Sequence, residues 1–190
     1  MSTGDVHTFL FTDLVGYTAL ADSEGDERAA QVAVEFAALI GELLPQYGAT
    51  LVKALGDGLM IRCDEPADGI RLGLRIVGAV DATAGFPPVR VGVHTGSAVH
   101  RDGDWYGRGV NVAARLCAAA GGGQLLVSER TREAARGIRR LDVGERKLHW
   151  LKNVTEPIAA ATITEAARGR LRGACGHGPA KLGLLRGALR

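Results

Sequence analysis

A Gly-Asp-Gly triplet at positions 56–58 places the tightest constraint on how this chain can fold. It separates two short apolar segments, residues 50–55 and 59–61. Glycines on either side allow the backbone to turn sharply, including at positive φ, so the pattern predicts a β-hairpin. Asp57 is then expected at the tip, with Lys53 in the strand before it. An acidic residue at a turn is most often only a turn residue, so its role depends on what the rest of the chain places beside it.

The size and composition are those of a soluble globular protein. The chain has 190 residues, of which 46% are hydrophobic and 23% charged, which is enough for one well-filled core. We expect one main domain over residues 1–165. Residues 166–190 contain six basic and no acidic residues, so the net charge of +2 leaves −4 on residues 1–165. This basic tail is expected to be disordered or partly helical.

Several classes of protein find no support in the sequence. No apolar run approaches the ~20 residues of a membrane span, and the N-terminus lacks the basic start and apolar stretch of a signal peptide. Cys63, Cys117 and Cys175 are far apart and odd in number, which indicates neither a disulfide framework nor a zinc site. We therefore expect a reduced, cytoplasmic protein. The basic tail raises nucleic-acid binding as an alternative, but the tail has no aromatic residue to stack on bases, so no nucleic-acid partner is expected.

Apolar periodicity and turn residues predict an alternation of strands and helices. We expect strands over residues 6–12, 50–55, 59–61, 89–96, 124–127, 138–143, 147–151 and 157–163. We expect helices over residues 24–44, 66–80, 107–120 and 129–135, and a polar loop over 97–106. This order mixes antiparallel and long-range connections, which indicates an α+β fold with helices on one face of the sheet.

A second carboxylate, Asp13, follows the first expected strand and precedes Gly16. Asp13 and Asp57 thus each end or interrupt an apolar strand near a glycine, where a ligand can approach the backbone closely. Two carboxylates on adjacent strand ends suit Mg²⁺, which prefers oxygen ligands and keeps waters for substrate phosphates. On spacing alone, each carboxylate could equally cap a strand or a helix.

Three segments together resemble the class III nucleotide cyclases. Residues 11–18 (Phe-Thr-Asp-Leu-Val-Gly-Tyr-Thr) are similar to the first metal-binding segment of that family, and residues 53–60 (Lys-Ala-Leu-Gly-Asp-Gly-Leu-Met) to the second. Residues 104–116 (Asp-Trp-Tyr-Gly-Arg-Gly-Val-Asn-Val-Ala-Ala-Arg-Leu) resemble the segment that reads the base and holds the triphosphate. The three segments stand in family order and span most of residues 6–163.

The resemblance implies both a fold and an activity. The fold would have a ferredoxin-like (βαβ-βαβ) core with an antiparallel sheet and helices packed on it. The chain would act as a head-to-tail homodimer with two active sites at the interface. As an adenylate cyclase it would convert ATP to 3′,5′-cyclic AMP and pyrophosphate.

The resemblance also assigns the metal and phosphate sites. Asp13 and Asp57, with Leu14 beside them, would hold two Mg²⁺ or Mn²⁺ ions per active site. One ion would lower the pKa of the ribose 3′-hydroxyl, and the other would bind the triphosphate. Backbone N–H groups at the following helix start would bind phosphates, and they would come from Gly16, Tyr17 and Thr18.

Lys53 and Asp104 match the family's purine-selecting pair. A lysine can donate to adenine N1 and a carboxylate can accept from the N6 amine, whereas guanine presents the reversed pattern. A mismatch would leave buried polar groups unpaired at about 1–3 kcal/mol each, so the pair favours ATP. Guanylate cyclase activity is the first alternative. A catalytically inactive, nucleotide-binding regulatory module is the second.

Asn111 and Arg115 lie at i and i+4, on one face of the expected helix 107–120. In the family the asparagine orients the ribose, and the arginine stabilises negative charge developing on the α-phosphate. An arginine suits that task because its guanidinium is permanently charged and can donate two hydrogen bonds to a phosphate.

A further lysine near the C-terminal strands contacts the phosphates in many family members. Lys152 is the candidate here, because its segment is similar to the family's Leu-Lys-Gly pattern, although Asn153 replaces the glycine. Lys147 is the other possibility. His94, within an expected buried strand, is interpreted as a packing residue. Trp105 could line the base pocket, but loop aromatics also pack structurally, so it is not assigned to the site.

Overall fold

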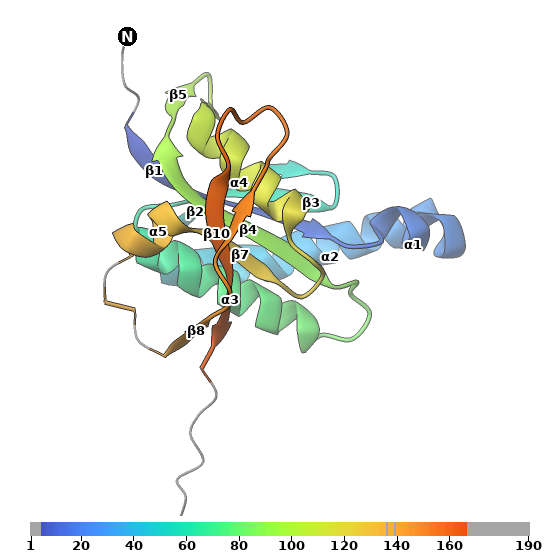
Figure 1. The fold of residues 1–190 in the computed structure, drawn as a ribbon. Coiled ribbons are helices and arrows are strands. Elements are labelled where there is room, and N and C mark those ends of the chain that lie inside the picture. Colours follow the sequence, from blue (N-terminus) through green and yellow to red (C-terminus); the bar gives the residue numbers. More distant parts are fainter. Residues whose placement is uncertain (1–4, 136, 139, 167–190) are drawn as a thin grey trace, which may run out of the picture.

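The computed structural model describes residues 5–135, 137–138 and 140–166 (Figure 1). The expected basic tail lies, apart from Ala166, outside these described residues. The strands are β1 (Val6–Leu14), β2 (Ala49–Leu55), β3 (Gly58–Cys63), β4 (Val89–Ser97), β5 (Val99–Arg101), β6 (Asp104–Tyr106), β7 (Leu125–Ser128), β8 (Leu141–Val143), β9 (Lys147–His149) and β10 (Ile158–Glu165). The helices are α1 (Tyr17–Glu24), α2 (Asp26–Leu43), α3 (Pro66–Asp81), α4 (Arg108–Ala119) and α5 (Glu129–Ala134), with a short 3₁₀ helix, η1, at Leu44–Tyr47. Among the described residues, no helix is long and apolar enough to cross a membrane.

The main sheet has the strand order β2-β3-β1-β4-β7-β10-β8, and β9 also pairs with β10. Its strands pair antiparallel except for β4 and β7, which run parallel. Strand β1 is central, between β3 and β4. The α+β class and the hairpin around Asp57 are therefore confirmed, with β2 and β3 joined through residues 56 and 57.

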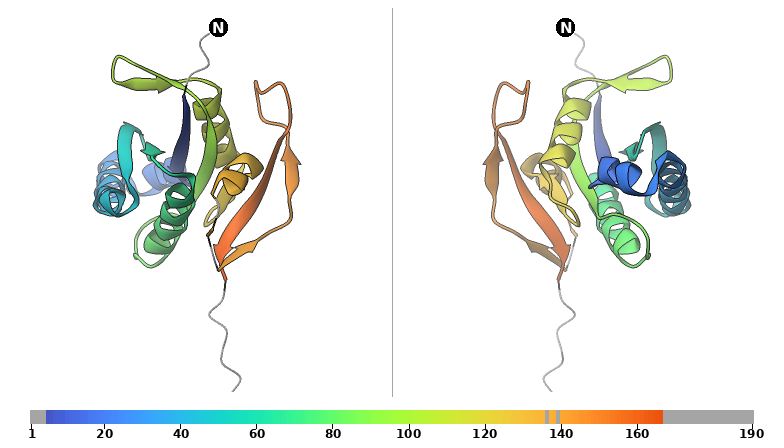
Figure 2. Two further views of the ribbon diagram at one scale, coloured as in Figure 1. Left: turned by 90° about the vertical axis from the view of Figure 1, so that its left-hand side faces the viewer. Right: turned by 90° about the vertical axis from the view of Figure 1, so that its right-hand side faces the viewer.

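Helices cover both faces of the sheet, whereas the sequence led us to expect one covered face (Figure 2). The larger core lies between the sheet and α2 and α3, and it includes Leu10 and Phe36. Helix α4 packs on the opposite face, where Phe9 contacts Met60 and Ala113. Successive side chains of a strand point to opposite faces, and β1 carries large apolar residues at both Phe9 and Leu10. Both faces therefore need a covering layer.

A second hairpin, β5–β6, replaces the loop expected over residues 97–106. Its strands pair Val99 with Tyr106 and Arg101 with Asp104. The two turn residues, Asp102 (φ 52°) and Gly103 (φ 79°), both have positive φ. Asp-Gly is a favoured pair in such two-residue turns, so this dipeptide was the signal for the hairpin.

Gly92 allows the backbone of α4 to lie directly against β4. A Cβ atom at this position would stand 2.1 Å from the backbone nitrogen of Cys117 and 2.7 Å from the carbonyl oxygen of Ala113. We expect Gly92→Ala to lower the free energy of unfolding by about 3 kcal/mol or more, because α4 must move to admit the methyl group. Urea unfolding measures this change.

Gly78→Ala is the matched control. Gly78 is exposed within α3, and an added Cβ would meet nothing within 4 Å. The same methyl group should raise the free energy of unfolding by up to about 1 kcal/mol, since alanine is the better helix former. Equal small effects at both positions would contradict the tight contact between α4 and β4.

Candidate functional site

The carboxylates Asp13 and Asp57 lie side by side because of the register between β1 and β3. Asp13 pairs with Gly58, the residue after Asp57. A Cβ at Gly58 would lie 2.4 Å from the carbonyl oxygen of Thr12, so glycine is required for the turn to approach β1 this closely. The structure therefore brings together the two residues expected to bind metal.

The electrostatics of Asp57 reflect this closeness. Partial burial raises the pKa of Asp57, and the negative charge of Asp13 raises that pKa further. A hydrogen bond from the backbone of Leu14 and the charge of Arg90 act in the opposite direction. The side chain of Leu14 is buried, so only its backbone is available to a bound ion.

Arg90 is a member of this group that the sequence reasoning missed. It pairs with Asp13 in the register of β1 and β4, and its Nε atom donates to Oδ2 of Asp13 over 2.7 Å. Its Nη1 atom also donates to the carbonyl oxygen of Ala118 over 3.2 Å. Arg90 thus compensates the charge of Asp13 and links that residue to the last turn of α4.

The donor set fits a hard divalent cation that keeps part of its water shell. Among residues 5–135, 137–138 and 140–166, no group of three or more His, Cys, Asp or Glu side chains could enclose a metal ion. Asp13 and Asp57 offer two carboxylates whose mutual repulsion, seen in the raised pKa of Asp57, a cation would relieve. Two carboxylates with remaining positions for water and substrate phosphate are typical of Mg²⁺ sites.

Lys53 and Asp104, 51 positions apart, form an ion pair that joins β2 to the β5–β6 hairpin. The hydrogen bond from Lys53 lowers the pKa of Asp104, and the backbone N–H of Trp105 supports this by donating to Oδ1 of Asp104 over 2.8 Å. The second expected pair is therefore also assembled within one chain, with opposite charges in contact.

Trp105 anchors the hairpin that carries Asp104, a role that sequence reasoning did not assign. Its ring centroid lies 4.3 Å from that of His7 and 5.6 Å from that of Phe9, both on β1. The Arg62 guanidinium lies 5.6 Å from the ring centroid of Trp105, within the range of a cation–π contact. These contacts hold β6 against the main sheet, and so they place Asp104 beside Lys53.

Asn111 and Arg115 are exposed on α4. The buried side of that helix carries Val112, Ala113 and Leu116. Within the described part of the chain, neither Asn111 nor Arg115 makes a side-chain hydrogen bond or an ion pair. No such contact connects them to Asp13 and Asp57 either, so the expected site residues fall into separate groups.

The expected phosphate-binding residues occupy two further segments. Gly16, with φ 85°, precedes α1, whose first residues are the partly buried Tyr17 and the exposed Thr18. Lys152 is exposed in the turn between β9 and β10. Asn153, which replaces the family's glycine, has φ 61°, a left-handed conformation that asparagine tolerates better than most residues.

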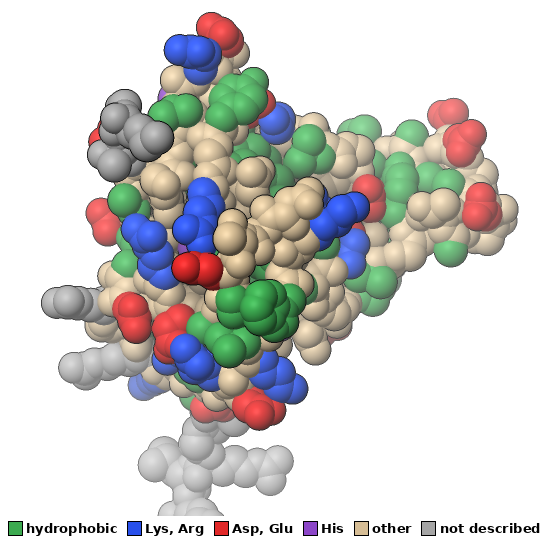
Figure 3. All heavy atoms as spheres, turned by 45° about the horizontal axis from the view of Figure 1, so that its top comes forward, with side chains coloured by type: hydrophobic (Ala, Val, Ile, Leu, Met, Phe, Trp, Pro, Cys, Tyr) green, Lys and Arg blue, Asp and Glu red, His purple; other side chains and the backbone are tan. Residues whose placement is uncertain are grey.

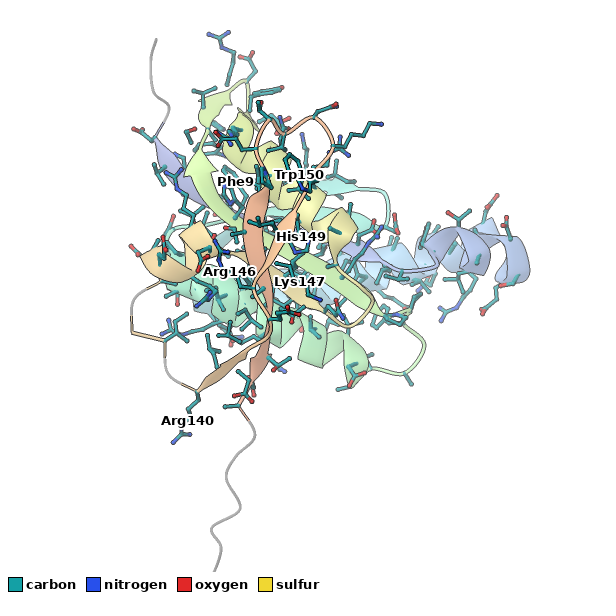
Figure 4. The ribbon with its side chains drawn as sticks, in the orientation of Figure 1. Phe9, Arg140, Arg146, Lys147, His149 and Trp150 are labelled. Atoms are coloured by element: carbon teal, nitrogen blue, oxygen red, sulfur yellow. The ribbon has the colours of Figure 1, made fainter. Side chains whose placement is uncertain are left out.

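Lys147, the other lysine considered, lies at the start of β9 next to Arg146 (Figure 4). It is exposed, and its Nζ atom stands 3.3 Å from a carboxylate oxygen of Glu145. Both lysines thus remain compatible with a contact to a bound phosphate.

Comparison with known proteins places this arrangement in a family. Residues 1–153 match the family described as the adenylate and guanylate cyclase catalytic domain. A pH-sensitive adenylate cyclase of Mycobacterium tuberculosis is 39% identical over 129 residues, which make up 67% of this chain and 32% of that protein. An adenylate cyclase of Streptomyces griseus is 33% identical over 110 residues, 58% of this chain and 28% of that protein. The chain thus spans about a third of the length of the curated relatives it matches.

Solved structures show the same fold. An adenylate/guanylate cyclase/hydrolase from Silicibacter pomeroyi is 28% identical with a TM-score of 0.74, covering 84% of this chain and 96% of that one. A monomeric adenylate cyclase from Trypanosoma brucei has a TM-score of 0.75 at 23% identity, covering 83% of this chain and 89% of that one. The predicted ferredoxin-like core is confirmed by these likenesses.

Proposed function

Because the chain belongs to the adenylate and guanylate cyclase catalytic domain family, we propose that it is an adenylate cyclase converting ATP to 3′,5′-cyclic AMP and pyrophosphate. The observation that carries the choice of ATP is the contact between Lys53 and Asp104. Lys53 would donate to adenine N1 and Asp104 would accept from the N6 amine. Named relatives that are adenylate cyclases support the same choice.

Cyclases of this family use divalent metal ions, and here we propose two Mg²⁺ or Mn²⁺ ions per active site. Asp13 and Asp57 would hold them, with the backbone of Leu14 beside them. When bound, such ions lower the pKa of the attacking hydroxyl and neutralise charge on the leaving pyrophosphate.

The protein's own side chains would position the reacting groups. Asn111 orients the ribose, and the 3′-oxygen forms a bond to the α-phosphorus while the bond to the pyrophosphate oxygen breaks. Arg115 donates to the oxygens of the α-phosphate, where negative charge develops. The pyrophosphate leaves with the electron pair of the broken bond, and backbone N–H groups at residues 16–18, together with Lys152, bind its oxygens. The proton of the 3′-hydroxyl passes to water.

We place each active site between two copies of the chain, in a homodimer. Asp13 and Asp57 of one copy would face Lys53, Asp104, Asn111 and Arg115 of the other. The exposure of Asn111 and Arg115 without side-chain partners in the described residues supports this division. We further propose that residues 1–165 form the catalytic unit. The buried free thiols of Cys63 and Cys117 suit the reducing cytoplasm, where we place the protein.

The direct test is an assay of the purified full chain with Mn²⁺ and either ATP or GTP. We expect cyclic AMP as the main product. Cyclic GMP as the main product would instead support guanylate cyclase activity. Nucleotide binding without either product, in a sample shown to be dimeric, would support the inactive regulatory module and refute the enzyme.

Reversing the charges of the purine-selecting pair should reverse the substrate preference. In the double variant Lys53→Glu/Asp104→Lys the ion pair is kept, but an acceptor now faces N1 and a donor faces the exocyclic group. Adenine is then mismatched at two positions and guanine is matched. We expect the ratio of kcat/KM for ATP over GTP to fall at least about a hundredfold.

The control for this reversal is the exchange Asp68→Arg/Arg71→Asp. This pair lies on α3, with 2.7 Å between Nη1 of Arg71 and Oδ1 of Asp68. Its exchange should leave the ATP to GTP ratio unchanged. A parallel loss of activity with both nucleotides in the Lys53→Glu/Asp104→Lys variant would contradict a role in purine selection.

A further inference from the structure

A cavity of about 380 Å³ lies at the end of β4 opposite to Arg90 and the metal-binding carboxylates. Its walls come from the end of β4, the first turn of α4, the start of α5 and the start of β10. None of the residues assigned to the cyclase reaction lines it. The residues that matter here are His94, Gly96, Arg108, Glu129, Arg130 and Glu156.

His94 is 6% exposed and belongs to a chain of buried hydrogen bonds. Its Nδ1 atom lies 2.8 Å from Oγ of Ser128, and that Oγ lies 2.8 Å from Oγ1 of Thr131. Two backbone N–H groups also donate to the hydroxyls of this chain. The N–H of Thr95 donates to Oγ1 of Thr131 over 2.7 Å, and the N–H of Thr131 donates to Oγ of Ser128 over 3.3 Å.

The protons of this network can be assigned because a buried hydroxyl needs an acceptor. Within the described residues, the one acceptor bonded to the Thr131 hydroxyl is Ser128 Oγ, because its other partner is the N–H donor of Thr95. We therefore assign the Thr131 proton to the bond with Ser128. The Ser128 hydroxyl must then donate to Nδ1 of His94. Nδ1 is therefore an acceptor, and the ring proton of neutral His94 sits on Nε2.

The Nε2–H group of His94 is directed at the cavity. A Cβ atom at Gly96, which lines the cavity, would stand 2.9 Å from Nε2, so glycine leaves this donor accessible. Nε2 has no hydrogen-bond partner within the described residues. Burial, and then the charges of Arg130 and Arg108, lower the pKa of His94 to about 4. His94 is thus neutral at physiological pH, and it presents a donor without requiring a counter-ion.

Two arginines and two glutamates line the cavity, and both glutamates are already in ion pairs. Arg108 and Glu156 pair at 3.7 Å. Glu129 is already bound by Arg132, at 3.3 Å, and by Arg146. Arg130 makes no ion pair among the residues that the structure describes. Figure 3 shows Lys and Arg side chains beside Asp and Glu side chains on one face of the molecule.

The first turn of α4 adds backbone donors. Its N-cap residue is Gly107, so no side chain caps the N–H groups of the first turn. The next two residues, Arg108 and Gly109, line the cavity. The N–H groups of a first helical turn lack partners within the helix and attract anions. The first turn of α4, the guanidinium group of Arg130 and the imidazole ring of His94 thus belong to residues that line one small space.

We propose that this cavity binds a small oxyanion, namely the phosphate or carboxylate group of a small molecule. Arginine forks and helix N-termini are preferred partners of such groups, and His94 supplies a neutral donor of fixed direction. The volume is at the low end for ligand pockets, which suits a small metabolite. The site is independent of the proposed cyclase reaction, so its test needs no turnover.

Titration of the full chain with inorganic phosphate, and separately with trifluoroacetate, a carboxylate that stays ionised at the acidic pH of this measurement, tests this proposal. Sodium chloride keeps the ionic strength constant. Imidazole NMR signals report the pKa of His94, whose resonance is identified by its loss in His94→Asn. We expect phosphate to raise this pKa above about 4, because a bound anion stabilises the imidazolium. A response to phosphate alone assigns a phosphate-bearing ligand, and a response to both anions assigns a general oxyanion site.

Two variants separate binding in the cavity from a general effect of salt. Arg130→Gln should weaken phosphate binding about tenfold or more. Arg75→Gln, which removes another exposed arginine from α3, should not. His94→Asn keeps an acceptor for Ser128 but lacks the Nε2–H donor, so it should also bind phosphate more weakly. An unchanged His94 pKa with both anions, or equal phosphate affinity of the wild type and Arg130→Gln, would overturn the proposal.

Discussion

Asp57→Asn is expected to lower cyclase turnover about a thousandfold or more. The amide has nearly the same shape as the carboxylate but no charge, so it cannot balance a divalent ion beside Asp13. A bound metal contributes several kcal/mol of transition-state stabilisation, and each 1.4 kcal/mol corresponds to a factor of ten in rate. The measurement is kcat with saturating ATP and Mn²⁺. Turnover within tenfold of the wild type would refute the assignment.

The same substitution should stabilise the metal-free protein at neutral pH. Folding raises the pKa of Asp57, so the ionised carboxylate costs stability when the pH exceeds the folded-state pKa. This cost disappears as the pH falls below the ordinary aspartate pKa, where Asp57 is protonated in both states. Asp57→Asn should therefore unfold at a higher urea concentration than the wild type at pH 7, and the difference should vanish in acid.

A matched control is Asp142→Asn, at an exposed position of β8. This variant should keep both wild-type turnover and wild-type stability. Gain of stability with loss of turnover, confined to Asp57→Asn, would identify a site where electrostatic strain is retained for function. Loss of stability in metal-free Asp57→Asn would contradict the repulsion between the two carboxylates.

Mixing the inactive variants Asp57→Ala and Arg115→Ala is expected to restore about a quarter of wild-type activity. Each variant alone inactivates both active sites of its homodimer. In a heterodimer with shared sites, one site receives both lesions and the other receives none. Random exchange of equal amounts makes half of the dimers heterodimers, and each has one intact site out of two. Cyclic AMP production after subunit exchange measures the recovery.

The pair Asp57→Ala and Asp13→Ala provides the control. Both residues belong to the same group on the same chain, so every site of that heterodimer carries one lesion and no activity should return. Recovery in neither mixture, with subunit exchange demonstrated, would refute sites shared between copies. Recovery of activity in both mixtures would indicate contamination, or a different distribution of the site residues between the two copies.

The two hairpins show which features of the fold local sequence patterns can predict. The β2–β3 hairpin was predicted because an apolar segment stands on each side of its Gly-Asp-Gly turn. The β5–β6 hairpin was not, although Asp102-Gly103 is an equally good turn, because its strands have only three residues each. Short, exposed strands carry no apolar alternation, and their pairing depends on Trp105 packing against β1.

The members of the proposed metal-binding group differ in the same way. Asp13 and Asp57 were predicted because their segments resemble a family motif. Arg90 was not, because its contact with Asp13 depends on the register of β1 and β4, which no local pattern encodes. His94 is buried, which agrees with its interpretation as a packing residue. The access to its Nε2 atom, however, depends on Gly96 and on the position of α4. Register and interlayer packing are properties of the whole fold.

The direct backbone contact between Gly92 and α4 has a consequence for regulation. No side chain separates β4 from α4 at Gly92, and Arg90 bonds to both Asp13 and α4, so β1, β4 and α4 should move as one rigid unit. The distance between Arg115 and the carboxylates of Asp13 and Asp57 in the same chain is then fixed. In a site built from two copies, a regulatory signal would change the rate by rotating the unit of one copy against the unit of the other. Each unit would keep its shape, and the distance between Arg115 of one copy and the carboxylates of the other would set the activity.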